Sequence, residues 1–251
     1  MKAITIENEK LNKVAKITLL FWIMKIIATT LGETLGDLLA HTLHLGYAIG
    51  LAITGVFFLI VLAIQLKAKK YIPTLFWLVI AGTTTVGTEI SDFMDRTLHL
   101  GYLAGSLILI TLLLNTLWIW NSTIGKIEVY PIFNKKVESF FWIAILLSNS
   151  LGTAFGDFLS DNAGLSYLQG AMVTTGVILI VVLLHYTTKI NHIILFWVAF
   201  IFTRPFGATF GDLLTKTTAE GGLDLGTIPA TLVSVTLLSI LVVYSHKKKL
   251  V

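Results

Sequence analysis

The chain has 251 residues and a net charge of +4, and 55% of its residues are apolar while only 13% are charged. Soluble domains carry about 25% charged residues, so this composition excludes an ordinary globular enzyme, a disordered chain and a nucleic-acid-binding domain. The absence of cysteine excludes disulfides and thiolate metal sites. With a mean hydropathy of +0.86, we expect one integral membrane domain, residues 1–251, without a nucleic-acid partner.

Eight hydrophobic runs follow one another along the chain, each near the roughly 20 residues that cross a hydrocarbon core about 30 Å thick. The predicted spans are about 17–40, 46–66, 74–96, 101–120, 138–160, 167–186, 190–214 and 225–245. Most connections are short, and the longest, 121–137, is a polar linker. The pattern predicts an all-α integral membrane fold of eight transmembrane helices surrounded by lipid.

Basic residues gather on one side of these predicted spans. Fourteen lysines belong to that side, namely Lys2, Lys10, Lys13, Lys16, Lys67, Lys69, Lys70, Lys126, Lys135, Lys136, Lys189, Lys247, Lys248 and Lys249. The opposite side has only Arg96 and Lys216. Because positive loops stay in the cytoplasm, we expect both termini to be cytoplasmic. The basic net charge is thereby explained without an anionic partner.

One motif occurs four times. A Phe-Trp pair opens each odd-numbered span at Phe21, Phe76, Phe141 and Phe196, and an aspartate follows sixteen residues later at Asp37, Asp92, Asp157 and Asp212. A Leu-Gly-Tyr or similar segment then opens the even-numbered span. The repeats, about 17–66, 74–120, 138–186 and 190–245, predict four parallel two-helix units around a pseudo-symmetry axis along the membrane normal. The even spans are almost wholly apolar, so we expect them to form the outer shell.

The Phe-Trp, Gly-Glu-Thr-Leu-Gly-Asp and Leu-Gly-Tyr segments of the first repeat resemble a bacterial and archaeal family of four-repeat, so-called membrane-anchored proteins of unassigned function. The resemblance covers the whole chain. It implies an eight-span bundle and implies no activity. The third and fourth repeats lack the glutamate of the motif, so any role of that glutamate is not four-fold.

Acidic residues within the odd spans are the main candidates for function. Ionisable groups inside a membrane normally face a cavity or a partner because each costs about 2.5–3.5 kcal/mol. The candidates for cation binding or proton relay are Glu33, Asp37, Glu89, Asp92, Asp157 and Asp212. A polar stripe shares one helix face with the aspartates, at i−4 and i−8, and comprises Thr29, Thr84, Thr88, Asn149 and Thr153. We expect Glu33 and Glu89 to form a deeper site and the aspartates an outer vestibule.

Two basic residues are the candidate charge partners of these acids. Arg204 is expected to pair with a carboxylate such as Glu33 or Glu89, whereas Lys25 can extend its amino group toward the cytoplasm. Six acids against these two bases leave an excess of at least four negative charges, which favours protonation or a bound cation.

Other polar and aromatic residues have competing interpretations. His41, His44, Asp95 and His99 form a weak outer metal candidate, although histidines in short loops are more often simply solvated. The Gly-x-x-x-Gly spacings favour close helix packing. The Phe-Trp pairs are typical of an aromatic belt at the membrane interface.

Two functions remain open. The first is a secondary transporter of a small cation, a divalent metal or a proton-coupled ion, which is not an enzyme and uses no cofactor. The second is a non-transporting membrane scaffold or partner-binding protein whose polar residues serve helix packing. The sequence leaves the ion, the direction of transport and the oligomeric state open.

Overall fold

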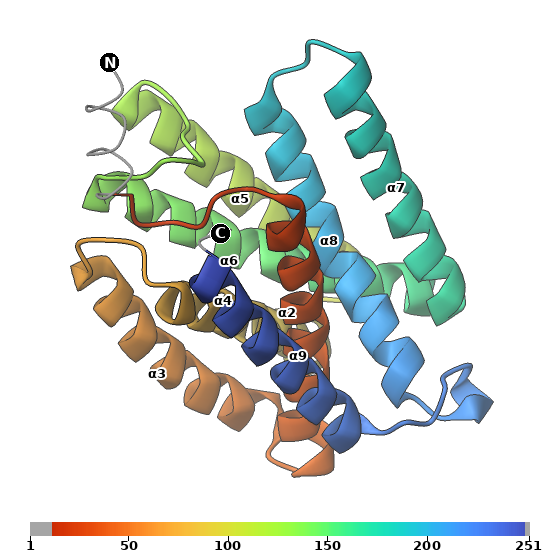
Figure 1. Cartoon of the computed structure of the whole chain (residues 1–251). Coiled ribbons are helices and arrows are strands. Elements are labelled where there is room, and N and C mark those ends of the chain that lie inside the picture. Colours follow the sequence, from red (N-terminus) through yellow and green to blue (C-terminus); the bar gives the residue numbers. More distant parts are fainter. Residues whose placement is uncertain (1–11, 249–251) are drawn as a thin grey trace.

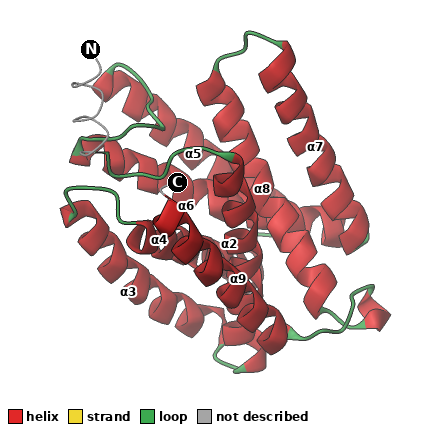
Figure 2. Ribbon diagram, viewed as in Figure 1, coloured by secondary structure: helices red, strands yellow, loops and turns green. Residues whose placement is uncertain are grey.

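A computed structural model describes residues 12–248 and shows that each predicted span is a helix (Figure 1). The helices are α2 (Leu19–Asp37), α3 (Gly46–Lys67), α4 (Pro73–Asp92), α5 (Tyr102–Ile124), α6 (Lys135–Asp157), α7 (Tyr167–Thr187), α8 (His192–Thr215) and α9 (Thr227–Lys248). Loops and short turns join them, and residues 12–248 contain no strand (Figure 2). The prediction of an all-helical fold is confirmed. Lys2, Lys10 and Lys249, which entered the prediction of orientation, lie outside the described residues.

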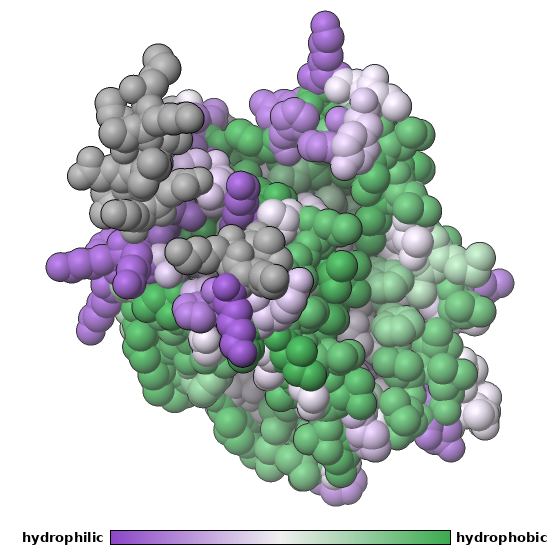
Figure 3. Space-filling model, in the orientation of Figure 1, coloured by the Kyte–Doolittle hydropathy of each residue, from purple (hydrophilic) through white to green (hydrophobic). Residues whose placement is uncertain are grey.

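Seven of these helices are long and apolar enough to cross a membrane, as expected of a multi-pass membrane protein. The exception is α4, whose 20 residues include a run of threonines from Thr83 to Thr85 and two acids. Exposed leucine, isoleucine and valine side chains cover α3, α5, α7 and α9. Figure 3 shows this apolar surface along the flanks of the helices, with hydrophilic residues gathered toward their ends.

The four helices that open with a Phe-Trp pair form a closed ring. Helix α2 packs against α4 and α8, and α6 packs against the same two helices, so α2 lies opposite α6 and α4 lies opposite α8. The remaining helices lie outside this ring, as predicted for the apolar even-numbered spans. Each packs mainly against the ring helix of the following repeat: α3 on α4, α5 on α6, α7 on α8, and α9 on α2. The last repeat thus closes onto the first.

Glycines explain how closely the ring helices approach. A Cβ placed on Gly32 would lie 2.6 Å from the Cβ of Thr84 on α4. The same contact recurs around the ring, where Gly87 faces Asn149, Gly152 faces Arg204, and Gly207 faces Thr29. In each pair the glycine lies eleven residues after the phenylalanine of its own repeat, and its partner lies eight residues after the phenylalanine of the next repeat. Their role in close packing, predicted from the Gly-x-x-x-Gly spacing, agrees with these contacts.

The Phe-Trp pairs, apart from the partly exposed Trp22, are buried inside the bundle, so their predicted place in an aromatic belt at the membrane interface is wrong. Phe21, Phe76, Trp77 and Trp142 are at most 2% exposed. The rings pack between repeats: the centroids of Phe21 and Trp77 are 5.6 Å apart, and those of Phe76 and Trp142 are 5.4 Å apart. The pairs begin helices whose neighbours lie on both sides, so burial in the ring replaces exposure to lipid headgroups.

The segment before α2 crosses this aromatic end of the ring. The backbone of Lys13 donates to the carbonyl of Ile132, and the carbonyl of Asn12 accepts from the backbone of Tyr71. The Lys13 amino group forms a buried ion pair with Glu138 at the start of α6, and Gln65 donates to the same carboxylate at 2.9 Å. This segment therefore ties together the connections before α4 and before α6.

The aspartate end has a different local structure. Directly after Asp37, Asp92 and Asp157 the helices continue into five-residue π-helical turns, Leu38–Thr42, Phe93–Thr97 and Phe158–Asn162. In the fourth repeat α8 instead ends at Thr215, and a single 3-10 turn, Thr218–Glu220, follows. These turns position the side chains that surround the ring of aspartates.

Candidate cation site in the helix ring

Side chains directed into the ring lie in layers about 6 Å apart, because successive motif positions four residues apart are about one helical turn apart. The aromatic layer comes first, and the next layer contains Lys25 with Ile80, Ile145 and Phe200, all fully buried. Polar layers follow: Thr29, Thr84, Asn149 and Arg204, then Glu33, Thr88, Thr153 and Ala208, and finally the four aspartates. The ring is thus apolar toward its aromatic end and acidic toward its aspartate end.

Arg204 is the central cation of this arrangement. Its guanidinium is fully buried, and Nη2 lies 2.9 Å from Oε2 of Glu33 on the neighbouring helix α2. Nη2 also donates to the hydroxyl of Thr88 on the opposite helix, and Nη1 donates to the carbonyl of Thr29 at 3.4 Å. Of the two partners proposed for Arg204, Glu33 is the one that the fold places beside it.

Two further cations neutralise part of the aspartate layer. Nζ of Lys216 lies 2.7 Å from Asp37 and 3.3 Å from Asp212. In the same way Arg96 lies 3.4 Å from Asp92 and 3.5 Å from Asp157. Each of these cations follows the aspartate of its own repeat by four residues and also contacts the aspartate of the next repeat.

The electrostatic effect is clearest at Lys216, which follows the end of α8. Burial lowers the pKa of its amino group, but Asp212 and Asp37 outweigh that effect and hold the pKa above its usual range. Lys216 is therefore charged throughout the neutral range. At the positions equivalent to Lys216 and Arg96, the first and third repeats have His41 and Asp161.

Three carboxylates converge without an equivalent number of cations. One ligand atom from each of Glu33, Asp157 and Asp212 lies within 4.8 Å of the others, and all three residues are buried. They come from α2, α6 and α8, so three of the four ring helices contribute. Oxygen ligands at this spacing suit a hard divalent cation such as Mg²⁺, Mn²⁺ or Ca²⁺.

The charges of this region can be counted directly. Five carboxylates, those of Glu33 and the four aspartates, face three cations, Arg204, Arg96 and Lys216, which leaves 5 − 3 = 2 negative charges. The excess is smaller than predicted because the sequence-based count omitted Arg96 and Lys216. Two uncompensated charges correspond to one divalent ion or two protons.

Lys25 does not extend toward the cytoplasmic side, so that prediction is wrong. The side chain is fully buried, and Nζ donates to Oδ1 of Asn149 on the opposite helix α6 at 2.8 Å. The amino group also lies 4.1 Å from the ring centroid of Phe200. No carboxylate pairs with it among the described residues. An amide and an aromatic face are therefore the contacts of this amino group inside the ring.

Glu89 lies apart from the three converging carboxylates. Its oxygens face Gly50 of α3, where an added Cβ would lie 2.7 Å from Oε1. The expected deeper site of Glu33 with Glu89 is therefore not assembled in this structure. Glu89 follows Thr88 directly in α4, so its side chain is rotated by about 100° from the polar stripe to which Thr88 belongs.

The threonines of the polar stripe bind mainly to neighbouring backbones. Thr84 donates to the carbonyl of Ala28 at 2.9 Å, Thr88 to that of Gly32 at 3.3 Å, and Thr29 to that of Thr203 at 3.2 Å. Each bond joins one ring helix to the next, beside a close glycine contact. Thr153 donates instead to the carbonyl of Asn149 within its own helix.

The outer histidines have a conformational explanation. His44 and His99 have φ angles of 54° and 55°, and the equivalent positions of the other repeats, Gly164 and Asp224, have φ angles of 70° and 55°. Glycine, aspartate and histidine tolerate this left-handed region better than most residues. His41 lies 3.7 Å from Asp37, while Asp95 accepts from Ser91. The one metal-like group found in residues 12–248 includes none of these four candidates.

Sequence reasoning missed Arg96 and Lys216 as partners of the aspartates. The signal was available, because extending the stripe by one turn past each aspartate reaches His41, Arg96, Asp161 and Lys216. It also missed the ion pair between Lys13 and Glu138, for which no local pattern exists because the two residues are 125 positions apart.

The chain was compared with known proteins. Four segments, residues 20–71, 75–123, 140–191 and 195–249, match the family described as a repeat of unknown function, DUF347. No curated protein and no solved structure matches the chain. The matched segments coincide with the four helix pairs.

Proposed function

The chain belongs to the family defined by this repeat, and from that premise we propose that it is a secondary transporter of a small cation. The observation that carries the proposal is the convergence of Glu33, Asp157 and Asp212 within 4.8 Å in a region with two uncompensated negative charges. Such a group binds either one divalent metal ion or protons, and exchange between them couples the two ions.

The proposed route lies along the axis of the ring, with the helices crossing the membrane and both termini in the cytoplasm. On this view the aspartate layer faces outward and receives the ion. The aromatic layer and the Lys25 layer close the inner half of the ring. Arg204 pairs with Glu33, one of the three converging carboxylates, and holds its side chain at the inner side of the site. Movement of the Lys25 and Arg204 side chains would open the inner half of the ring. The chain binds and moves an ion and converts no substrate.

Thermal unfolding of the purified full-length protein tests ion binding directly. Mg²⁺, Mn²⁺, Ca²⁺, Zn²⁺, Na⁺ and K⁺ are added separately at pH 6 and pH 8. A ligand that binds only the folded state stabilises it by RT ln(1 + [L]/Kd), about 2.7 kcal/mol at a concentration of 100 Kd. We expect one divalent ion to raise the melting temperature, and more strongly at pH 8, where protons compete less.

Matched variants separate the site from general charge effects. Asp157→Asn removes one converging carboxylate, whereas Asp161→Asn removes an exposed carboxylate one turn further along the same helix. The ion-dependent shift should disappear in the first variant and persist in the second. Uptake of the same ion into vesicles containing the protein should follow the same order. Equal shifts in both variants would contradict the proposed site.

The alternative function, a membrane scaffold, is favoured by one observation. The threonines of the stripe and the glycines beside them join adjacent helices, which is the behaviour of packing residues. A packing role does not explain the three converging carboxylates, since like charges at this spacing oppose helix packing. If no ion shifts the melting temperature and Asp157→Asn stabilises the protein, the scaffold becomes the better account.

A further inference from the structure

Glu89 is a buried carboxyl group that the proposed cation site does not use. Its side chain is fully buried, and neither carboxylate oxygen has a hydrogen-bond partner in the described part of the chain. The carboxyl group occupies the junction of α4 with two other helices. A Cβ added to Gly50 of α3 would lie 2.7 Å from Oε1 of Glu89, and a Cβ added to Gly36 of α2 would lie 3.9 Å from the same oxygen. The missing Cβ of Gly50 leaves the space that the carboxyl group fills.

The charges around Glu89 do not compensate it. Glu33 and Asp37 of α2 act on it with the same sign, and Asp92 follows three residues later on its own helix. On the α3 side Tyr47 is three residues from Gly50 and is its nearest titratable residue in that helix. Helix α6 contributes Asp157, which is ion-paired with Arg96.

The fourth helix packed near Glu89 adds no charge there. In α9 the titratable residues with described side chains, Tyr244, His246 and Lys247, all lie near its C-terminal end. An ionised carboxylate without a partner costs several kcal/mol in an apolar site, whereas the neutral acid costs far less.

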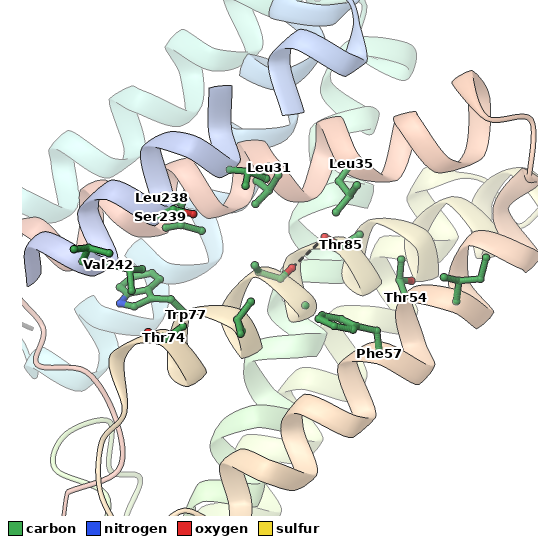
Figure 4. Close-up of a pocket in the computed structure, with 16 residues that line it drawn as sticks. Leu31, Leu35, Thr54, Phe57, Thr74, Trp77, Thr85, Leu238, Ser239 and Val242 are labelled. Carbon is green, nitrogen blue, oxygen red and sulfur yellow. Dashed lines mark hydrogen bonds between the residues drawn. The ribbon is translucent and has the colours of Figure 1, made fainter. Parts of the chain in front are cut away.

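A groove opens on the lipid-facing surface about one helical turn from Glu89. It has a volume of about 500 Å³ and lies between α3, α4 and α9, with α2 at its base (Figure 4). Thr54 and Thr85 belong to its wall, and each lies four residues, or about 6 Å along its helix, from Gly50 and Glu89 respectively. Phe57 on the same wall is 54% exposed, so the groove opens on the apolar flank.

Two small residues of the second repeat line the groove. Ala81 and Gly82 stand where the other repeats have Ile26-Ile27, Leu146-Leu147 and Ile201-Phe202. The second repeat is also the one with a glutamate at the position equivalent to Thr34, Ala154 and Thr209. The small residues in the wall of the groove and the unpartnered acid therefore belong to the same repeat.

We propose that Glu89 is a lipid-accessible proton-binding site, held as the neutral acid one helical turn beyond Thr85, which lines the groove between α3, α4 and α9. It is separate from the group of Glu33, Asp157 and Asp212. The proposal therefore stands whether or not the chain transports a cation. In a transporter the site would supply an exchangeable proton near the route of the ion.

Labelling with dicyclohexylcarbodiimide tests this proposal on the full-length protein in lipid vesicles. This apolar reagent adds to a protonated carboxyl group: the acidic proton moves to one nitrogen, the carboxyl oxygen bonds to the central carbon, and rearrangement gives an acylurea with no leaving group. Peptide mass spectrometry then locates the added mass. We expect the label on Glu89 at pH 7 and its loss in Glu89→Gln. Glu220, an exposed carboxylate that accepts hydrogen bonds from Thr217 outside the spanning helices, serves as the internal control and should remain unlabelled.

A second variant tests the route. Ala81→Leu places in the groove the side chain that the third repeat has at Leu146, and Ala52→Leu adds the same volume on an exposed face of α3 outside the groove. Labelling of Glu89 should slow in the first variant and stay unchanged in the second. Absence of label on Glu89 in the wild type overturns the proton site. Equal rates in the two variants overturn the groove as its access.

Discussion

The amino group of Lys25 on α2 donates a hydrogen bond to Oδ1 of Asn149 on α6 across the helix ring, at 2.8 Å. Arg204 joins the other diagonal, because it belongs to α8 and donates to the hydroxyl of Thr88 on α4. Each pair of opposite helices is thus linked by one buried basic side chain. Both links lie between the aromatic layer and the converging carboxylates, so they hold the ring closed on the inner side of the candidate site.

Removing the partner of Lys25 should destabilise the fold more than removing both residues. Asn149→Leu leaves the buried amino group of Lys25 without its hydrogen-bond acceptor, and an unsatisfied buried polar group costs about 1–3 kcal/mol. The double variant Lys25→Met with Asn149→Leu removes the amino group as well and should regain most of the lost stability. Thermal unfolding of the three proteins in one detergent measures the difference. A double variant no more stable than Asn149→Leu alone would show that Lys25 does not depend on Asn149.

Adding a methyl group at a close glycine contact should disrupt the ring. Gly152→Ala puts a Cβ 2.4 Å from the Cβ of Arg204, and overpacking of this kind costs about 1–3 kcal/mol. Gly55→Ala and Gly176→Ala are matched controls within α3 and α7, since a Cβ there meets nothing within 4 Å. The controls should be neutral or slightly stabilising because alanine favours helices. Melting temperatures that fall equally in all three would refute the packing role.

Replacing His44 and His99 should show whether these histidines are present for their positive φ angles or for metal binding. His44→Gly and His99→Gly accept a positive φ without strain, so stability and any metal-dependent shift should be unchanged. His44→Val should cost about 1–2 kcal/mol, because the left-handed conformation is unfavourable for residues with a Cβ and most of all for branched ones. Unfolding curves with and without Zn²⁺ distinguish the two explanations. A metal-dependent shift that vanishes in the glycine variants would restore the histidines as ligands.

The contribution of Lys216 to the stability of the folded protein should be constant through neutral pH and should decline only at alkaline pH. Its pKa in the folded protein is held above its usual range by Asp212 and Asp37. A raised pKa stabilises the fold fully below the unfolded value, about 10.4 for lysine, and the effect is lost as pH rises through the folded value. The gap in melting temperature between the wild type and Lys216→Gln should therefore be equal at pH 7 and pH 9 and should narrow above about pH 10.4. A gap that narrows between pH 7 and pH 9 would contradict these ion pairs.

The sequence by itself determined the eight helices, their limits to within a few residues, the four repeats and the packing role of the glycines. Those features depend on local hydrophobicity and on fixed spacings, both of which are visible along the chain. It also limited the partners of Arg204 to an acid such as Glu33 or Glu89, because few acids share that depth in the bundle, and the structure selected Glu33.

The tertiary structure decided which helices meet and which side chains share a layer. Each outer helix packs on the ring helix of the next repeat, and that connection cannot be derived from spacing within one hairpin. The rotation of α4 directs Glu89 toward α3, and the closure of the ring brings Lys216 to Asp37 across 179 positions. Charge pairing at such separations depends on the registration of whole helices, which many weak contacts fix together.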